Sequence, residues 1–174
     1  MWPRLLALLL CAALLLACAR DDSWQAALAA EDYVAARRLL EAAAEQGDPV
    51  AQNRLGTLYY IGLGVPVDHG VAASWFKRAA LAGDPNAQRN LGSLFRQGLG
   101  VPRDELRAFG WYDAARRGGH PGAEDYMHWM TQFLGWNQQA YARRIVADDL
   151  RKGVVSECGE GLLMSKCPPP SGAR

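Results

Sequence analysis

Two closely spaced glycines are the first feature of the sequence that could perform chemistry. They are Gly62 and Gly64, in the stretch LGTLYYIGLGVP at positions 55–66. Glycines at this spacing occur in loops whose backbone binds phosphate, but such a loop follows a strand and opens a helix. The other interpretation is a turn that ends one helix before the next begins. The elements on either side of the glycines decide between the two.

The titratable and nucleophilic side chains form no catalytic or metal-binding pattern. Three histidines, His69, His120 and His128, are spread over the chain with no cysteine or carboxylate at ligand spacing. No serine stands in a nucleophile-elbow setting, and the pair Asp148-Asp149 is typical of a solvated surface. We therefore predict a protein that is not an enzyme, with no catalytic residues, no metal ion and no cofactor.

The first 20 residues, MWPRLLALLLCAALLLACAR, have the pattern of a secretory signal. The apolar run over residues 5–17 is shorter than the ~20 residues that a membrane-spanning helix needs. Residues 15–18, Leu-Leu-Ala-Cys, resemble the lipobox of bacterial lipoproteins, although Leu16 is bulkier than the residue usually found there. This resemblance implies that Cys18 becomes the N-terminus and carries acyl chains that anchor the protein to a membrane.

Two alternatives remain open for this N-terminus. Residues 17–19, Ala-Cys-Ala, also fit the A-x-A pattern of ordinary signal peptidase, which would release a soluble periplasmic or secreted protein without Cys18. The other alternative is an uncleaved anchor. Within the lipoprotein interpretation, Ala19 rather than an aspartate follows the cysteine, which favours the periplasmic face of the outer membrane.

The charges argue against two classes of partner. The chain carries 19 basic and 18 acidic residues, and loss of residues 1–17 removes one arginine and leaves it formally neutral. Nucleic acids and anionic membrane surfaces are bound by basic stripes, whereas no long block of like charge occurs here. We expect no nucleic-acid partner and no electrostatic binding to a membrane surface.

A repeat of 36 residues organises the middle of the chain. Residues 51–86 and 87–122 are identical at 16 of 36 positions when one segment is placed on the other. In each unit an aspartate caps a first helix, and after the two glycines Asp68 or its equivalent caps a second helix. The glycines therefore recur with the repeat after a predicted helix, which favours a turn over a phosphate loop.

The duplicated unit resembles the Sel-one-like repeat (SLR) family, relatives of the tetratricopeptide repeat with a longer loop. The family pattern appears as AQNRLGTLYYIGLGVPVDHGVAASWFKRAALAGDP and again as AQRNLGSLFRQGLGVPRDELRAFGWYDAARRGGHP. The resemblance implies an all-α fold, a short α/α solenoid of stacked helix pairs with a C-terminal capping helix.

The same resemblance divides the chain into segments, with the closing helix expected over residues 137–152. The segments are a signal peptide at 1–17, a partial N-terminal helix pair at 18–48, SLR units at 49–84 and 85–120, a partial unit with the capping helix at 121–152, and a flexible tail at 153–174.

The tail contains the last two cysteines, Cys158 and Cys167. They are the pair that remains once Cys11 is removed with the signal and Cys18 is either lipidated or lost. In an oxidising periplasm such a pair is expected to form a disulfide that fixes the tail. Two thiolates without two further ligands do not make a zinc site.

Helical repeat stacks present a concave surface built largely by their first helices. Residues that lie off the predicted buried stripe of those helices are the candidates for contact with a partner. They are Asn53, Thr57 and Tyr60 in one unit, Arg89, Ser93 and Arg96 in the next, and Trp129 and Phe133 in the third. An alternative for the two aromatic residues is that they only seal the last unit against the closing helix.

These patterns together predict a noncatalytic, lipid-anchored scaffold that binds a peptide or protein partner on its concave face. The alternative is an accessory of a peptidoglycan enzyme or a glycan-binding module, of which the sequence carries no sign.

Overall fold

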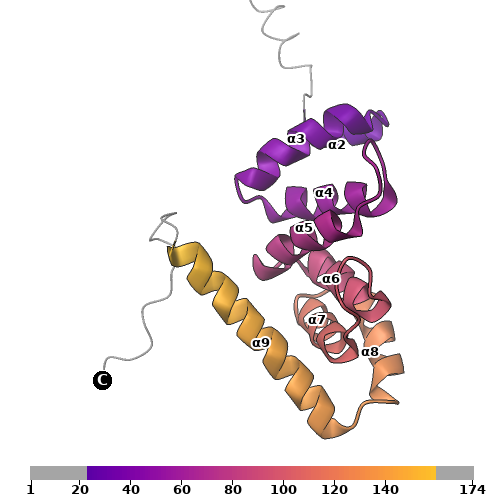
Figure 1. Ribbon diagram of the computed structural model, residues 1–174, viewed down its shortest axis with the longest axis vertical. Helices are drawn as coiled ribbons and strands as arrows, with labels where there is room; N and C mark the ends of the chain where they lie inside the picture. Colours follow the sequence, from indigo (N-terminus) through magenta and orange to yellow (C-terminus); the bar gives the residue numbers. More distant parts are fainter. Residues whose placement is uncertain (1–22, 160–174) are drawn as a thin grey trace, which may run out of the picture.

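The computed structural model describes residues 23–159, and all regular structure within them is helical (Figure 1). The helices are α2 (Trp24–Ala29), α3 (Tyr33–Glu45), α4 (Pro49–Ile61), α5 (His69–Leu81), α6 (Pro85–Gln97), α7 (Glu105–Arg117), α8 (Ala123–Thr131) and α9 (Trp136–Gly159). α2 packs on α3, α4 on α5 and α6 on α7, and α3·α4 and α5·α6 contacts join successive pairs. The predicted stack of helix pairs is confirmed.

Aspartate side chains set the start of the helices in the two full units. The carboxylate of Asp48 accepts a hydrogen bond from the backbone N–H of Val50 at 2.8 Å. Asp68, Asp84 and Asp104 cap the next three helices in the same way. Each cap satisfies an N–H group that has no partner within its own helix. The predicted helix starts are therefore confirmed.

Glycines within α4 and α6 let the two helices of a pair approach closely. A Cβ built on Gly56 would lie 2.8 Å from the ring of Phe76 in α5, and one on Gly92 would lie 3.2 Å from the ring of Tyr112 in α7. Both rings are buried, so the absent side chain leaves the space that an aromatic ring fills. This contact repeats once in each full unit.

The two glycine loops are contacts between successive units. Gly64 and Gly100 have left-handed backbones, with φ of +71° and +68°. A Cβ on Gly64 would lie 2.8 Å from the carbonyl oxygen of Tyr33, and one on Gly100 would overlap the backbone of His69. Tyr33 and His69 are the first residues of α3 and α5. Both loops follow a helix, which confirms their interpretation as turns.

The C-terminal helix differs from its prediction. It spans Trp136–Gly159 rather than residues 137–152, and so continues into the segment predicted as flexible tail. It does not pair with α8; it runs back across α7 and reaches α5 (Figure 1). At this crossing a Cβ on Gly153 would lie 2.8 Å from the side chain of Leu81. The glycine permits a close approach of two helices and does not end α9.

A buried carboxylate joins α9 to α7. The side chain of Asp113 is 2% exposed and lies 3.3 Å from Arg116, 3.0 Å from Arg117 and 3.5 Å from Arg143 of α9. A carboxylate shielded from water is stable in its charged form only with such partners. Lys77 occupies the equivalent position in the preceding unit and is exposed. The contact is therefore specific to the last full unit, where α9 docks.

Candidate protein-interaction face

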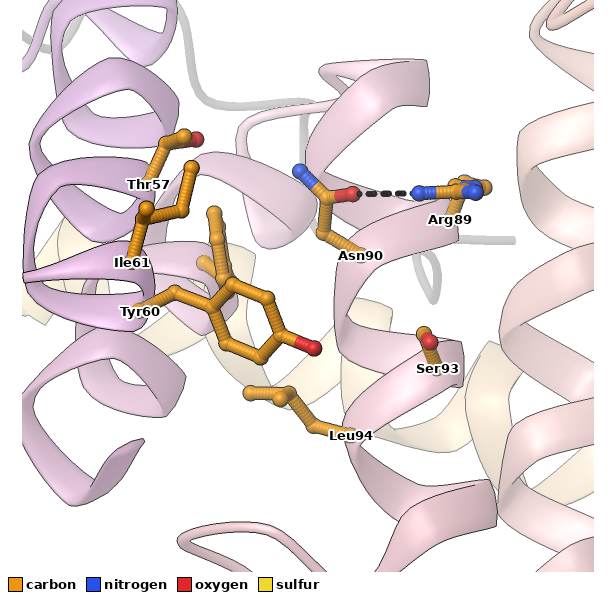
Figure 2. A pocket seen from close by; sticks show the side chains of 8 residues that line it. Thr57, Tyr60, Ile61, Arg89, Asn90, Ser93 and Leu94 are labelled. Atoms are coloured by element: carbon orange, nitrogen blue, oxygen red, sulfur yellow. Dashed lines mark hydrogen bonds between the residues drawn. The ribbon is translucent and has the colours of Figure 1, made fainter. Parts of the chain in front are cut away.

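Side-chain hydrogen bonds join the first helices α4, α6 and α8 to one another, and we call the surface that these three helices form the first-helix face. A hollow of about 210 Å³ lies between α4 and α6 on this face (Figure 2). Tyr60, Ile61, Phe76 and Leu94 give it apolar walls. Four polar side chains complete the lining, and they are Thr57, Arg89, Asn90 and Ser93.

A second hollow, of about 260 Å³, adjoins the first on the same face. The two share Thr57, Arg89 and Asn90. The other lining residues of the second hollow are Val50, Asn53, Arg54, Asp84, Asn86 and His120. The face thus offers two adjoining hollows, the first mainly apolar and the second mainly polar.

A chain of hydrogen bonds crosses the first-helix face. Asn90 of α6 donates through its amide to Oδ1 of Asn53 in α4 at 3.0 Å. Arg89 donates to Oδ1 of Asn90 at 3.1 Å (Figure 2) and to the hydroxyl oxygen of Tyr126 in α8, also at 3.1 Å. The chain joins α4, α6 and α8 and holds these side chains in fixed orientations.

The same chain of hydrogen bonds fixes the side chain of Asn53. Its Oδ1 accepts from Asn90 and the residue is only 8% exposed, so Asn53 lines the second hollow with little free surface, and its contact with a partner stays a prediction. Asn90, which the predictions omit, lines both hollows. Both bonds between helices join residues 37 positions apart, one more than the sequence repeat. An alignment of equivalent positions does not reveal this offset.

The structure brings four predicted contact residues together around the first hollow, namely Thr57, Tyr60, Arg89 and Ser93. All four are half-buried, and Tyr60 lies between α4 and α6 in Figure 2. Arg96 lies further along α6, where its guanidinium carbon is 5.9 Å from the ring centroid of Tyr126.

Trp129 and Phe133 form a separate apolar site. Their ring centroids lie 5.2 Å apart, and the residues are 52% and 68% exposed. With Glu105, Met130 and Leu134 they line a depression of about 270 Å³. Because α9 packs on α7 and leaves both rings exposed, the interpretation that they seal the last unit against the closing helix is wrong.

Three stretches, residues 26–48, 49–84 and 85–120, match the family model of the Sel1 repeat. The chain belongs to the Sel1 repeat family. The matches end at residue 120, just before α8, whose expected partner helix instead packs on α7. The partial unit predicted at the N-terminus is matched over residues 26–48.

Two solved structures are similar to this Sel1 repeat protein. A Sel1 repeat protein from Oxalobacter formigenes is 41% identical, with a TM-score of 0.53, over 54% of this chain and 71% of that one. A protective antigen present in uropathogenic Escherichia coli strains, which displays an SLR fold, is 25% identical with a TM-score of 0.64. That match covers 83% of this chain and 31% of the antigen. No curated protein is detectably similar to the chain.

The histidines of this Sel1 repeat protein lie apart from one another. Tyr60 packs near His69, with ring centroids 5.2 Å apart, and His120 accepts a hydrogen bond from the backbone N–H of Gly122 at 3.1 Å. His128 is exposed on α8. Within residues 23–159, no three His, Cys, Asp or Glu side chains are placed to hold a metal ion.

Two further predictions concern the ends of the chain. Cys18 and Cys167 lie outside the described residues, and Cys158 lies in the last turn of α9, where side chains are not described. The described part of the chain contains no helix with both the length and the apolar character needed to cross a membrane.

Proposed function

We propose that this protein is a noncatalytic scaffold whose first-helix face binds a peptide segment of a partner protein. Sel1 repeats generally mediate protein–protein interactions. The observation that carries the proposal is the pair of adjoining hollows between α4 and α6, where polar and aromatic side chains remain half-exposed. Exposed tyrosine and arginine side chains are favoured anchors of protein interfaces.

The size of the hollows supports a peptide as the bound molecule. Small-molecule and cofactor sites usually have volumes of about 300–1,000 Å³ and enclose most of the ligand. The two hollows on the first-helix face measure about 210 and 260 Å³ and are open to solvent. Each is of a size to take one or two side chains of an extended segment.

A protein partner is best tested by photocrosslinking in living cells. A photoreactive amino acid at Ser93 in the first-helix face should capture one protein, and the same amino acid at exposed Lys77 of α5 should not. Mass spectrometry identifies the captured protein, and Tyr60→Ala should remove it. Equal capture from both positions would contradict the proposal. Peptidoglycan fragments without any protein would instead support the cell-wall alternative.

We also propose that Cys18 anchors the scaffold to the periplasmic side of the outer membrane through acyl chains. The support is the resemblance of Leu-Leu-Ala-Cys to a lipobox, with Ala19 following the cysteine. Cys18→Ala should move the protein from the membrane fraction to the soluble periplasmic fraction. An unchanged distribution in sucrose-gradient fractions would argue against the anchor.

A further inference from the structure

Two arginines of α6 lack the carboxylate partner that comparable arginines have. Among the arginines of residues 23–159, five are half-buried, and they are Arg37, Arg89, Arg96, Arg107 and Arg143. Three of them form ion pairs, with Glu41, with Asp104 and Asp149, and with Asp113. Arg89 and Arg96 form none with any described residue, and both lie on the first-helix face.

The missing partner matters because a partly desolvated guanidinium is stabilised by a carboxylate. Arg89 and Arg96 stand two turns apart on one side of α6, with Ser93 between them. Arg89 has only neutral partners, and Nε of Arg96 is buried without a hydrogen-bond acceptor among the described residues. The helix therefore holds two positive charges together that no described carboxylate neutralises.

The guanidinium groups of Arg89 and Arg96 both lie close to the ring of Tyr126. The guanidinium carbons of Arg89 and Arg96 lie 5.3 and 5.9 Å from the centroid of its ring. The ring is held by stacking on Tyr112, with centroids 5.0 Å apart and planes 7° apart. Its hydroxyl oxygen accepts from Arg89, so the hydroxyl hydrogen remains available to an acceptor. Two guanidiniums and one O–H thus surround the site.

We propose that Arg89, Arg96 and Tyr126 bind an acidic side chain, aspartate or glutamate, within the partner's peptide. This proposal rests on the proposed function and specifies the chemistry of the partner. Arg89 also lines the hollow walled by Tyr60 and Leu94, so an apolar residue of the same peptide enters that hollow next to the acidic one. Hydrogen bonds from α6 reach Asn53 of α4 and Tyr126 of α8, so first helices flank α6 on both sides, which suits an internal residue of a peptide rather than its end.

The test is selection of peptides from a random 12-residue phage library on the full chain. The native protein should enrich sequences with Asp or Glu close to a large apolar residue. The Arg89→Gln/Arg96→Gln variant should lose that enrichment, because glutamine keeps hydrogen-bonding groups but removes the charge. Arg144→Gln, at an exposed position on α9, is the matched control and should enrich the same sequences as the native protein. Unchanged thermal unfolding of the double variant excludes misfolding as the reason.

Synthetic copies of one enriched peptide give the affinity. Replacing its acidic residue with the amide should weaken binding about tenfold or more, the usual effect of losing a central interface anchor. Amidation of the peptide's C-terminus should have no such effect. Binding should also weaken between 50 and 500 mM NaCl, because the contact is ionic.

The outcomes distinguish failure of the acidic-residue inference from failure of the proposed peptide-binding function. Enriched sequences without acidic residues, or acidic sequences that bind the double variant equally well, overturn the inference and leave the peptide-binding function in place. Loss of affinity on C-terminal amidation alone also overturns it, because the carboxylate would then be the chain end. Failure to enrich any sequence contradicts the proposed function, and the inference with it.

Discussion

Gly110 of α7 lies directly beneath α9, so close that a Cβ built on it would stand 2.5 Å from the carbonyl oxygen of Ala142. Ala142 and Val146 are fully buried at this contact. The position equivalent to Gly110 in the preceding unit is Ser74, which is exposed. Because residue 110 has no side chain, α9 can pack directly against the backbone of α7.

Gly110→Ala should push α9 away from α7. Filling a close-packed contact with a methyl group costs about 1–3 kcal/mol, and here the obstacle is backbone that cannot rotate aside. We expect a lower midpoint of urea unfolding and faster tryptic cleavage at Arg143 and Arg144. Ser74→Ala makes a similarly small change at the equivalent exposed position and should shift stability by no more than ~0.5 kcal/mol. Equal protease resistance of native protein and Gly110→Ala would show that the helices do not pack this closely.

Asp113→Asn should destabilise the fold by about 1–3 kcal/mol, the usual scale for loss of a charge-assisted hydrogen bond to a buried group. The amide keeps the shape of the carboxylate but no longer balances three guanidiniums. Asp149→Asn is the control, because its ion pair with Arg107 is partly exposed and worth at most ~1 kcal/mol. Chemical unfolding monitored by circular dichroism measures both. A loss for Asp113→Asn no larger than that for Asp149→Asn would refute the assigned role.

Tyr112→Phe should leave stability unchanged or raise it by up to ~1 kcal/mol, because the buried hydroxyl of Tyr112 lacks a partner among the described residues. Phe76 fills the equivalent place in the preceding unit and shows that the ring alone suits the site. Thermal unfolding provides the measurement. A loss above 1 kcal/mol would indicate that the hydroxyl has a hydrogen-bond partner after all.

Gly100→Ala should cost more than Gly119→Ala, although both glycines have a left-handed backbone. A side chain in that conformation costs about 1–2 kcal/mol by itself. A Cβ on Gly119 would meet open space, whereas one on Gly100 would overlap the backbone of His69 in the preceding unit. The difference between the two unfolding free energies isolates the contact between units. Equal losses would mean that the loop does not pack there.

Trp129→Ser and Phe133→Ser should change the unfolding free energy by no more than ~0.5 kcal/mol, because both rings are largely exposed. Trp111→Ala is the contrasting variant, since Trp111 is 1% exposed and its loss should cost about 3–5 kcal/mol. If the two exposed aromatic residues belong to the partner site, the serine variants should reduce photocrosslinking while folding normally. A large loss of stability would identify them as core residues.

The repeated parts of the fold could be predicted from the sequence, and so could the presence of a closing helix, but not the length of that helix or the helices it packs on. Asp48 and Asp84 predict helix starts, and the paired glycines predict the turns. Both predictions succeed because caps and left-handed turns depend on residues adjacent in the sequence. The end of α9 could not be predicted in this way. Gly153 resembles a helix stop until Leu81, 72 positions earlier in the chain, is known to lie against it.

The sequence could predict which helix face carries the candidate site. It could not predict how far each side chain on that face is exposed. Thr57, Tyr60, Arg89 and Ser93 line the first hollow as their positions off the buried stripe suggested. Asn53 also lies off the predicted stripe and is nevertheless buried, with its Oδ1 bonded to Asn90, one position beyond its equivalent Arg89. Such an offset depends on how rigid helix pairs stack, which no single unit encodes.

The path of α9 has a consequence for how the protein unfolds. In an open array each unit touches only its neighbours, so the ends can unfold before the middle. Here one continuous helix contacts both α7 and α5, which belong to different units, and so it couples their unfolding. The two full units, residues 49–84 and 85–120, should therefore unfold together in a single cooperative step.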